Sequence, residues 1–537
     1  MKKNLLEKAI LVILFSLLAL PIIFPYFHSG FFPTHDGEWT VVRLADMFRE
    51  LRDHQFPPRF SGNLNFGYGY PLFNFAYPLP YYLGIALHVL KINFVDSIKV
   101  LFAISVPLSG IGMFFCSRLL FKKTQAGIVS AILYMYMPYR LVDLYVRGSL
   151  GESLAFFLFP AIFFCILKVL DVGSRIWIGI GGILYGCLIL THNIMAVYFT
   201  LFILFFLIGQ SFFTKSKSII YVFFTLSIGL LLSTFFWLPA LYEKRFILLS
   251  VIPIADRSIN FVSFSQLITS SWGFGVPGGS SGFTYALGLP QIIAGISVIF
   301  LLLFTKGIKK QIPFIILGIF FVFSLFLFQF SAPLWKLPII SEINYPWTIL
   351  GPLGFLLSLL SGLLALNKYT LIVAGTVCFL AFIFITPYAR PQYYVDRGEG
   401  FYVTNDATTT SSHEFMPLWV KIIPFQRPEK KVEIVKGSGD IRNVYSTSKE
   451  ISFISDLSQK SLVRINTIYY PGWQVKDIVI MHNSKLGVME FWLEKGAHMV
   501  HLQFMETSLR LLSDIVSLVS FVILISFFGI KICFPKK

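Results

Sequence analysis

Apolar runs of about 20 residues recur along most of the chain, and polar segments separate them. A helix of about 20 apolar residues is long enough to cross the hydrocarbon core of a bilayer. The pattern therefore predicts a polytopic α-helical membrane protein with about 12 to 13 hydrophobic segments. In chain order the predicted segments are 9–27, 71–90, 98–120, 125–138, 153–170, 176–191, 194–213, 218–238, 286–304, 311–330, 346–366, 370–387 and 511–533.

Basic residues lie mainly at the termini and in short loops between these segments. Two such loops contain Lys215, Lys217, Lys306, Lys309 and Lys310. Cytoplasmic loops are enriched in Lys and Arg, so we expect these loops and both termini inside the cell. The first segment lacks a small-residue cleavage site and is too long for a signal-peptide core, so we expect it to be retained. The long loops 28–70, 239–285 and 388–508 then lie on the extracytoplasmic face.

The number of crossings between the first two acidic loops is ambiguous. Asp36 and Glu152 are both expected outside, which requires an even number of crossings, but three apolar segments separate them. The segment 71–90 contains three prolines, so we favour a segment that enters the bilayer and leaves on the same side. Alternatively, the short segment 125–138 does not cross. The sequence leaves both solutions open.

Alternating apolar and polar residues replace the long apolar runs between residues 388 and 508. The alternation is clearest in 488–504, where apolar residues recur with period two on either side of Lys495-Gly496. This pattern predicts a β-hairpin with a turn at Lys495-Gly496 in a small exported β-rich domain. The expected organisation is a multi-spanning domain 1–387 with the outer loop 28–70, a β-rich domain 388–508, and a last transmembrane helix with a basic cytoplasmic tail in 509–537.

Composition agrees with a membrane protein, because 56% of the residues are hydrophobic and only 13% are charged. The formal net charge of +17 follows from basic cytoplasmic loops and does not indicate a nucleic-acid partner. The five cysteines lie in or beside apolar segments, so we expect no disulfide framework.

The first long loop carries an unusual density of charge. After Asp36 and Glu38, apolar residues recur at helical spacing through Leu51, and charged residues occupy the other positions. This pattern predicts an amphipathic helix in the membrane interface, with a carboxylate pair at its start. In the alternative interpretation, Asp36 is only a helix cap and Glu38 only a first-turn acid favoured by the helix dipole.

Several motifs together resemble one family. They are the first loop with its exit FPPRF, then GYGYPLFNFAYPLPYYL, RGSLGESLAFFLFP, LTHNIMAVYF, INYPWTIL, HEFMPLW and YYPGWQV. The set is similar to the 6-pyruvoyl-tetrahydropterin-synthase-related membrane proteins of the GT-C glycosyltransferase superfamily. Relatives often carry Gln-Phe-Pro-Trp-Arg where this chain has residues 344–348, Asn-Tyr-Pro-Trp-Thr. A pterin synthase needs converging zinc-binding histidines, whereas the odd spacing of His498 and His501 on a strand points them to opposite faces.

The resemblance implies a GT-C fold and inverting sugar transfer from a polyprenyl phosphate to an envelope glycan, lipid or protein on the extracytoplasmic face. Such a reaction needs a base for the acceptor hydroxyl and donors or cations for the departing phosphate. Asp36 is the expected base, and Glu38 and Glu152 are further catalytic candidates. For Glu152, dipole complementarity at a helix start is the alternative explanation.

The candidate substrate-binding residues are Arg43, Arg59, Tyr68, Tyr70, Arg140, Arg147, His192 and Asn193. Guanidinium groups suit phosphate, although contact with lipid head groups would explain the same arginines. A membrane histidine such as His192 is often structural. Whether Asp36, Glu38 and Glu152 hold Mg²⁺ or Mn²⁺ stays open, because a monophosphate can leave without a metal.

Two other classes of function compete with a transferase. A transporter or flippase of lipid-linked glycans would be expected to carry ionisable groups within its spans. Seven predicted segments, among them 9–27, 153–170 and 346–366, contain no Asp or Glu. This distribution favours chemistry at the membrane surface. A scaffold for envelope polymer assembly is the third possibility.

Overall fold

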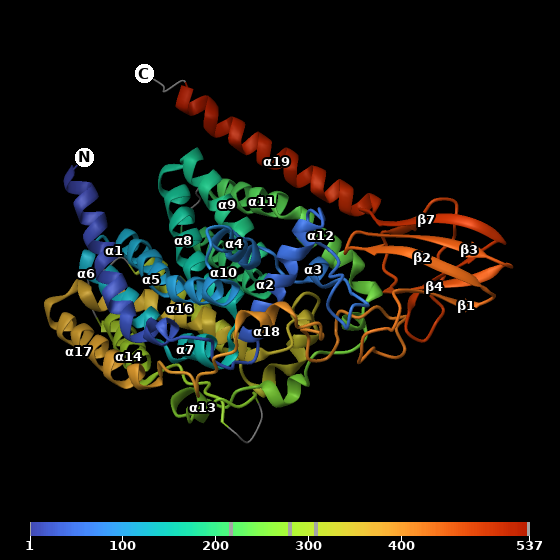
Figure 1. Cartoon of the computed structure of the whole chain (residues 1–537). Coiled ribbons are helices and arrows are strands. Elements are labelled where there is room, and N and C mark those ends of the chain that lie inside the picture. Colours follow the sequence, from blue (N-terminus) through green and yellow to red (C-terminus); the bar gives the residue numbers. More distant parts are fainter. Residues whose placement is uncertain (1, 214–217, 278–281, 305–309, 534–537) are drawn as a thin grey trace.

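The computed structural model describes residues 2–213, 218–277, 282–304 and 310–533 (Figure 1). A large helical domain carries a small β domain at one side, and the last helix, α19, runs back along the helical domain from the β domain. The predicted polytopic helical architecture with a β-rich unit before the last helix is confirmed. Of the predicted cytoplasmic lysines, Lys215, Lys217, Lys306 and Lys309 lie outside the described residues.

Each predicted hydrophobic segment contains a helix. Within the described ranges, seven helices are long and apolar enough to cross a membrane, or up to nine if each of two bent pairs is one span. The seven are built from α1(Lys2–Ile23), α5(Phe94–Phe121), α8(Leu150–Val172), α10(Asn193–Ser211), α16(Leu350–Ser361), α17(Lys368–Ile385) and α19(Ser508–Cys533). The bent pairs are α11(Ile219–Leu232) with α12(Thr234–Glu243), at 71°, and α15(Gln311–Leu325) with η6(Gln329–Lys336), at 93°. The shorter apolar helices are α4(Leu79–Val89), α6(Thr124–Met135), α9(Arg175–Thr191) and α14(Leu289–Phe304).

Neither of the two ambiguous segments forms a full-length span. The prolines of 71–90 divide it into α3(Leu72–Phe75) and the 11-residue α4, and α6 has only 12 residues. Both are well short of the roughly 20 residues that cross hydrocarbon. Helix length therefore does not distinguish the two solutions of the crossing count.

The β domain consists of two antiparallel sheets. One has the strand order β1(Val432–Lys436), β4(Ser461–Ile468), β6(Val488–Leu493), and the other has β2(Gly439–Ser446), β3(Glu450–Leu457), β7(Gly496–Phe504), β5(Trp473–Val475). Buried residues of both sheets, among them Phe453, Val463, Phe491 and Leu502, form one core. Such a core is typical of sheets that pack face to face.

The predicted hairpin is wrong. Both strands exist, but β6 pairs with β4, where Phe491 lies opposite Val463, and β7 pairs with β3, where Val500 lies opposite Phe453. The chain crosses from one sheet to the other at residues 494–495. Period-two alternation identifies strands and their buried face, but it does not identify the partner strand.

Replacing Gly496 with Val is expected to lower the free energy of unfolding by about 1–3 kcal/mol. Gly496 has φ +123°, and no atom lies within 4 Å of the position of an added Cβ, so backbone strain alone supplies the cost. Urea unfolding of the full chain in detergent measures the effect. Gly398 is the matched control, because its surroundings are equally open and its φ is −56°. Equal stability of the two Val variants would contradict the expectation.

The predicted amphipathic helix is α2(Gly37–Arg52), but its polar face is not free. Asp46 and Glu50 are 2% and 0% exposed. Glu50 accepts hydrogen bonds from Gly62 N at 3.0 Å and from Gln55 Nε2 at 3.2 Å. Protein covers both of these acids, so the polar side of the predicted interfacial helix is partly buried. Burial raises the pKa of Asp46 to about 6.

Candidate functional site

The first loop and the second loop are joined through their backbones directly before α2. His35 N donates to Val146 O at 3.0 Å, and Asp36 N donates to Arg147 O at 2.8 Å. The second loop contains α7(Pro138–Val142), the π-helical turn η2(Asp143–Arg147) and then Gly148, which has φ +65°. A Cβ at Gly148 would collide with Thr34 Oγ1 and lie 2.8 Å from Gly37 N. Glycine at this position therefore permits the close approach that brings Asp36 to Arg147.

The Asp36 carboxylate is half-buried and has no hydrogen-bond or ion-pair partner among the described residues. Asp36 occupies the N-cap position of α2, but its side chain makes no capping bond. Thr34 Oγ1 instead accepts the hydrogen bond of Gly37 N at 2.9 Å. The Asp36 side chain therefore does not cap α2, in contrast to the capping interpretation.

Glu152 lies in a compact cluster with three side chains of the second loop. Arg147 Nη1 forms an ion pair with Glu152 Oε2, and Tyr139 Oη donates to Glu152 Oε1 at 2.7 Å. Arg147 Nη1 also lies 3.3 Å from Asp143 Oδ1, and Ser153 Oγ donates to Asp143 Oδ2 at 2.5 Å. Burial and the nearby charge of Glu152 raise the pKa of Asp143 to about 8.

Aromatic side chains and His192 lie next to these charges. The Tyr77 ring stacks on the His192 ring, with centroids 5.3 Å apart, and Arg147 lies over the Trp347 ring at 4.8 Å. Burial raises the pKa of the Tyr77 and Tyr345 hydroxyls, and both feel the charges of Asp36 and Arg147. Both hydroxyls therefore stay protonated and can donate hydrogen bonds.

His192 is a neutral N-cap of α10. Its Nδ1 accepts a hydrogen bond from Met195 N at 3.3 Å, so this network assigns the ring proton to Nε2. Burial lowers the pKa of His192 to about 4, although Glu152 opposes the shift. The structural role considered from the sequence is thus present, and it leaves Nε2–H as a donor.

Other predicted site residues have different neighbours. Glu38 accepts from Arg397 Nη1 at 3.0 Å and from Tyr402 Oη at 3.3 Å. Arg43 Nε donates to Thr409 Oγ1 at 3.0 Å, and Tyr70 Oη lies 3.0 Å from the same hydroxyl. Arg43 and Tyr70 therefore hold the segment that enters the β domain, at the rim of the site, where the charge of Asp36 still reaches Arg43.

Four more candidates do not join the Asp36 cluster. Arg140 is fully buried and donates to Ser153 O and Ser105 Oγ. Arg59 is also buried and forms ion pairs with Glu506 at 3.2 Å and Asp514 at 2.8 Å. Tyr68 is buried beside the β domain, and Asn193 is exposed and accepts from Ile194 N.

The candidate metal ligands Asp36, Glu38 and Glu152 do not converge. Among the residues that the structure describes, no group of three or more His, Cys, Asp or Glu side chains is placed to hold a metal ion. Glu38 and Glu152 already form ion pairs with Arg397 and Arg147. The residues present therefore do not fit a Mg²⁺ or Mn²⁺ site, and the chemistry proposed below uses none.

Sequence reasoning missed Tyr77, Tyr139, Asp143 and Tyr345 as members of the site. Asp143 stands four residues before Arg147, a helical spacing at which opposite charges meet, and this signal was available. Tyr77 and Tyr345 lie in the motifs GYGYPLFNFAYPLPYYL and INYPWTIL, but nothing in those motifs indicates that either hydroxyl feels the charge of Asp36.

Comparisons with known proteins agree with the resemblance found in the sequence. An uncharacterized protein of Lactococcus lactis subsp. cremoris (strain MG1363) is 25% identical over 256 residues, which are 45% of this chain and 41% of that protein. The chain thus spans less than half the length of that relative.

The solved structures that match the chain include an arabinofuranosyltransferase and an oligosaccharyltransferase. The first is arabinofuranosyltransferase AftD from Mycobacteria. Its TM-score is 0.45 at 12% identity, and the match covers 72% of this chain and 28% of the AftD chain. The second is the oligosaccharyltransferase AglB from Archaeoglobus fulgidus, in complex with an inhibitory peptide and a dolichol-phosphate. Its TM-score is 0.48 at 12% identity, and the match covers 78% of this chain and 61% of that chain.

The family itself is shown by a match over residues 73–386, more than half of the chain, to the description "6-pyruvoyl-tetrahydropterin synthase related domain; membrane protein". The chain belongs to this family of membrane proteins.

Proposed function

We propose that the protein transfers a sugar, with inversion, from a polyprenyl-phosphate donor to an envelope glycan, lipid or protein on the extracytoplasmic face of the cell membrane. The unpartnered Asp36 carboxylate, held by the backbone against the Arg147–Glu152 pair, is the observation that carries the proposal. A half-buried carboxylate without a partner is suited to accept a proton from a substrate hydroxyl.

In this reaction Asp36 takes the proton of the acceptor hydroxyl as its oxygen attacks the anomeric carbon. The bond between that carbon and the phosphate oxygen breaks, and its electron pair leaves with the polyprenyl phosphate. The developing charge on the phosphate needs donors already in place. Tyr77 and Tyr345, which stay protonated, and His192 Nε2–H are the proposed donors.

Glu152 is the less suitable base because both of its oxygens have partners. Its role is to hold Arg147, whose backbone oxygen in turn fixes Asp36. The guanidinium also supplies positive charge near the reacting groups. Glu152 and Asp143 are therefore positioning residues in this proposal.

Mass analysis of polyprenyl-phosphate sugars and envelope glycans, in cells with and without the protein, tests the function. Loss of the protein should remove one sugar from a glycan, lipid or protein and cause one lipid-linked sugar to accumulate. Purified protein in liposomes should release polyprenyl phosphate from that lipid when the acceptor is added. A change in glycans without such release would favour a flippase, and unchanged glycans and lipids would contradict a transferase.

A further inference from the structure

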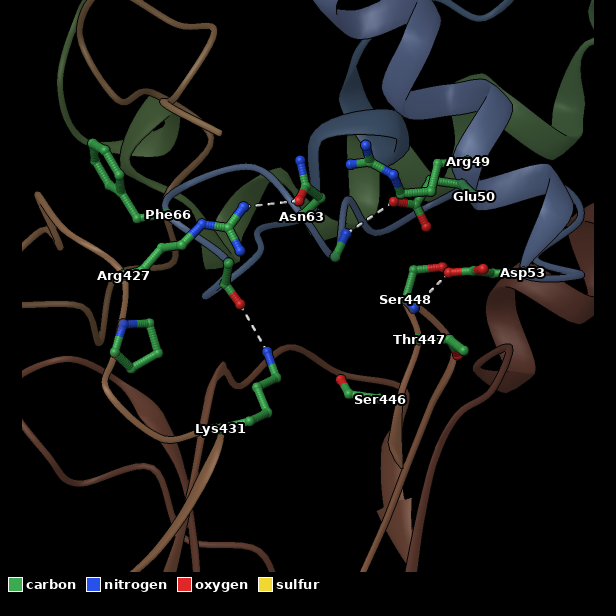
Figure 2. A pocket seen from close by; sticks show the side chains of 13 residues that line it. Arg49, Glu50, Asp53, Asn63, Phe66, Arg427, Lys431, Ser446, Thr447 and Ser448 are labelled. Carbon is green, nitrogen blue, oxygen red and sulfur yellow. Dashed lines mark hydrogen bonds between the residues drawn. The ribbon is translucent and has the colours of Figure 1, made fainter. Parts of the chain in front are cut away.

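A cavity lies where the end of α2 meets the β domain (Figure 2). Its volume is about 330 Å³, within the size range of small-ligand sites. Three cationic side chains and three hydroxyl groups line it together with Glu50 and Asp53. These six are Arg49, Arg427, Lys431, Ser446, Thr447 and Ser448.

One wall of the cavity has an uncommon backbone conformation. Asn65 and Phe66 have φ of 58° and 57°, followed by Gly67 at 79°. Residues other than glycine rarely adopt positive φ, and such a conformation persists only where its surroundings impose it. Phe66 N donates to Asp406 O at 2.6 Å, and Lys431 Nζ donates to Gly67 O at 2.7 Å. The wall is therefore held in place by the segment that leads into the β domain.

The carboxylates of the cavity are satisfied by the protein. Glu50 accepts from Gly62 N and Gln55 Nε2, and Asp53 accepts from Ser448 N at 2.8 Å. Both bonds to backbone nitrogens are drawn in Figure 2. These acids therefore do not need a ligand cation.

Lys431 is in the opposite situation. Its Nζ donates only to backbone oxygens, of Gly67 at 2.7 Å and Asn466 at 3.2 Å, and has no carboxylate partner among the described residues. Arg427 lines the same cavity with 57% of its side chain exposed, and it pairs with Asp406. Burial, and then the nearby positive Arg427, lower the pKa of Lys431 to about 7. An anion in the cavity would offset both effects.

We propose that this cavity binds an anionic saccharide, a sugar ring that carries a carboxylate or a phosphate. Lys431 and Arg427 would meet the anion, and the exposed hydroxyl of Ser446 suits the hydroxyl groups of a sugar. In the proposed function this saccharide is part of the acceptor, and that assignment rests on the proposed function. Arg49 lies 13 positions after Asp36 along α2, about 20 Å at 1.5 Å per residue, so the bound sugar is distant from the reacting hydroxyl.

Binding to the full-length protein in nanodiscs of phosphatidylcholine tests this site without any transfer reaction. The probes are oligogalacturonate, a phosphorylated maltohexaose, neutral maltohexaose and inorganic phosphate. We expect at least one anionic oligosaccharide to bind at least tenfold more tightly than neutral maltohexaose and than phosphate alone. Asp36→Asn protein should bind equally well, so failure of the proposed function would leave this result intact.

Two variants locate the binding in the cavity. Lys431→Met removes the uncompensated cation, and Ser446→Asp adds a negative charge while it leaves the bonds of Lys431 in place. Each should weaken binding at least tenfold. Lys460→Met is the control, because Lys460 is an exposed lysine of the same domain that pairs with Glu494.

Four results would overturn the proposal. The first is that neither anionic oligosaccharide binds more tightly than the neutral one, and the second is that Ser446→Asp protein binds as tightly as the wild type. Inorganic phosphate binding as tightly as the saccharides would show a simple anion site. Competition by phosphatidylglycerol in the nanodisc would show a site for lipid head groups.

Discussion

Replacing Asp36 with Asn is expected to lower the rate of sugar transfer by about 10²- to 10⁴-fold, because an amide cannot accept the proton of the acceptor hydroxyl. The protein should still fold and insert, since the Asp36 carboxylate has no partner to lose among the described residues. Asp36→Ala should behave in the same way, because Thr34 supplies the hydrogen bond at the start of α2. The measurement is the rate of polyprenyl phosphate release per amount of inserted protein.

Asp171→Asn is the control for this experiment. Asp171 is an exposed acid at the other end of α8 from Glu152, so its variant should transfer at the wild-type rate. A wild-type rate for Asp36→Asn would contradict Asp36 as the base and would move that role to Glu152.

Replacing Glu243 with Gln is expected to lower the free energy of unfolding by about 3–5 kcal/mol, the range for breaking a buried ion pair. Arg510 at the start of α19 binds Glu243 in bidentate fashion, at 2.8 and 2.6 Å, and their side chains are 0% and 3% exposed. Tyr470 Oη and Asn74 Nδ2 each donate to Glu243 Oε2 at 2.9 Å. Gln keeps the shape of Glu243 but leaves the charge of Arg510 buried and unpaired. Urea unfolding of the full chain in detergent measures the loss.

The double variant Glu243→Gln/Arg510→Met separates the pair from its surroundings. If the cost comes from an unpaired buried charge, removal of that charge should restore part of the lost stability. Lys460→Met breaks an exposed pair instead and should cost less than about 1 kcal/mol. A loss of similar size in Lys460→Met and Glu243→Gln would contradict a special role for the buried pair.

Local pattern predicted the elements of this protein far better than their partners. Apolar length located every hydrophobic segment, and alternation located β6 and β7, because both signals depend on residues close together in the chain. Strand pairing depends on residues far apart, so β6 and β7 were assigned to one hairpin although they belong to two sheets.

The same limit explains which site residues were predicted. Asp36 stands out as an acid at the start of an amphipathic helix, and Glu152 as an acid at the border of an apolar segment. Arg59 and Arg147 look alike in sequence, but the partners of Arg59 are 447 and 455 residues away, whereas those of Arg147 are four and five residues away. Only the structure distinguishes an arginine that joins distant helices from one beside the candidate base.

The long-range bonds of α2 also fix an order of events during synthesis. Asp53 accepts its hydrogen bond from Ser448, which is 395 residues later in the chain. At roughly 5–20 residues per second, the ribosome needs about 20–80 s to add that stretch. Throughout this time Asp53 lacks its donor Ser448 N, and Gln55, which donates to Glu50, lacks its contact with Ser448 Oγ. The helix that begins at the candidate base is therefore made early, but the bonds at its C-terminal end are completed only after the β domain has been made.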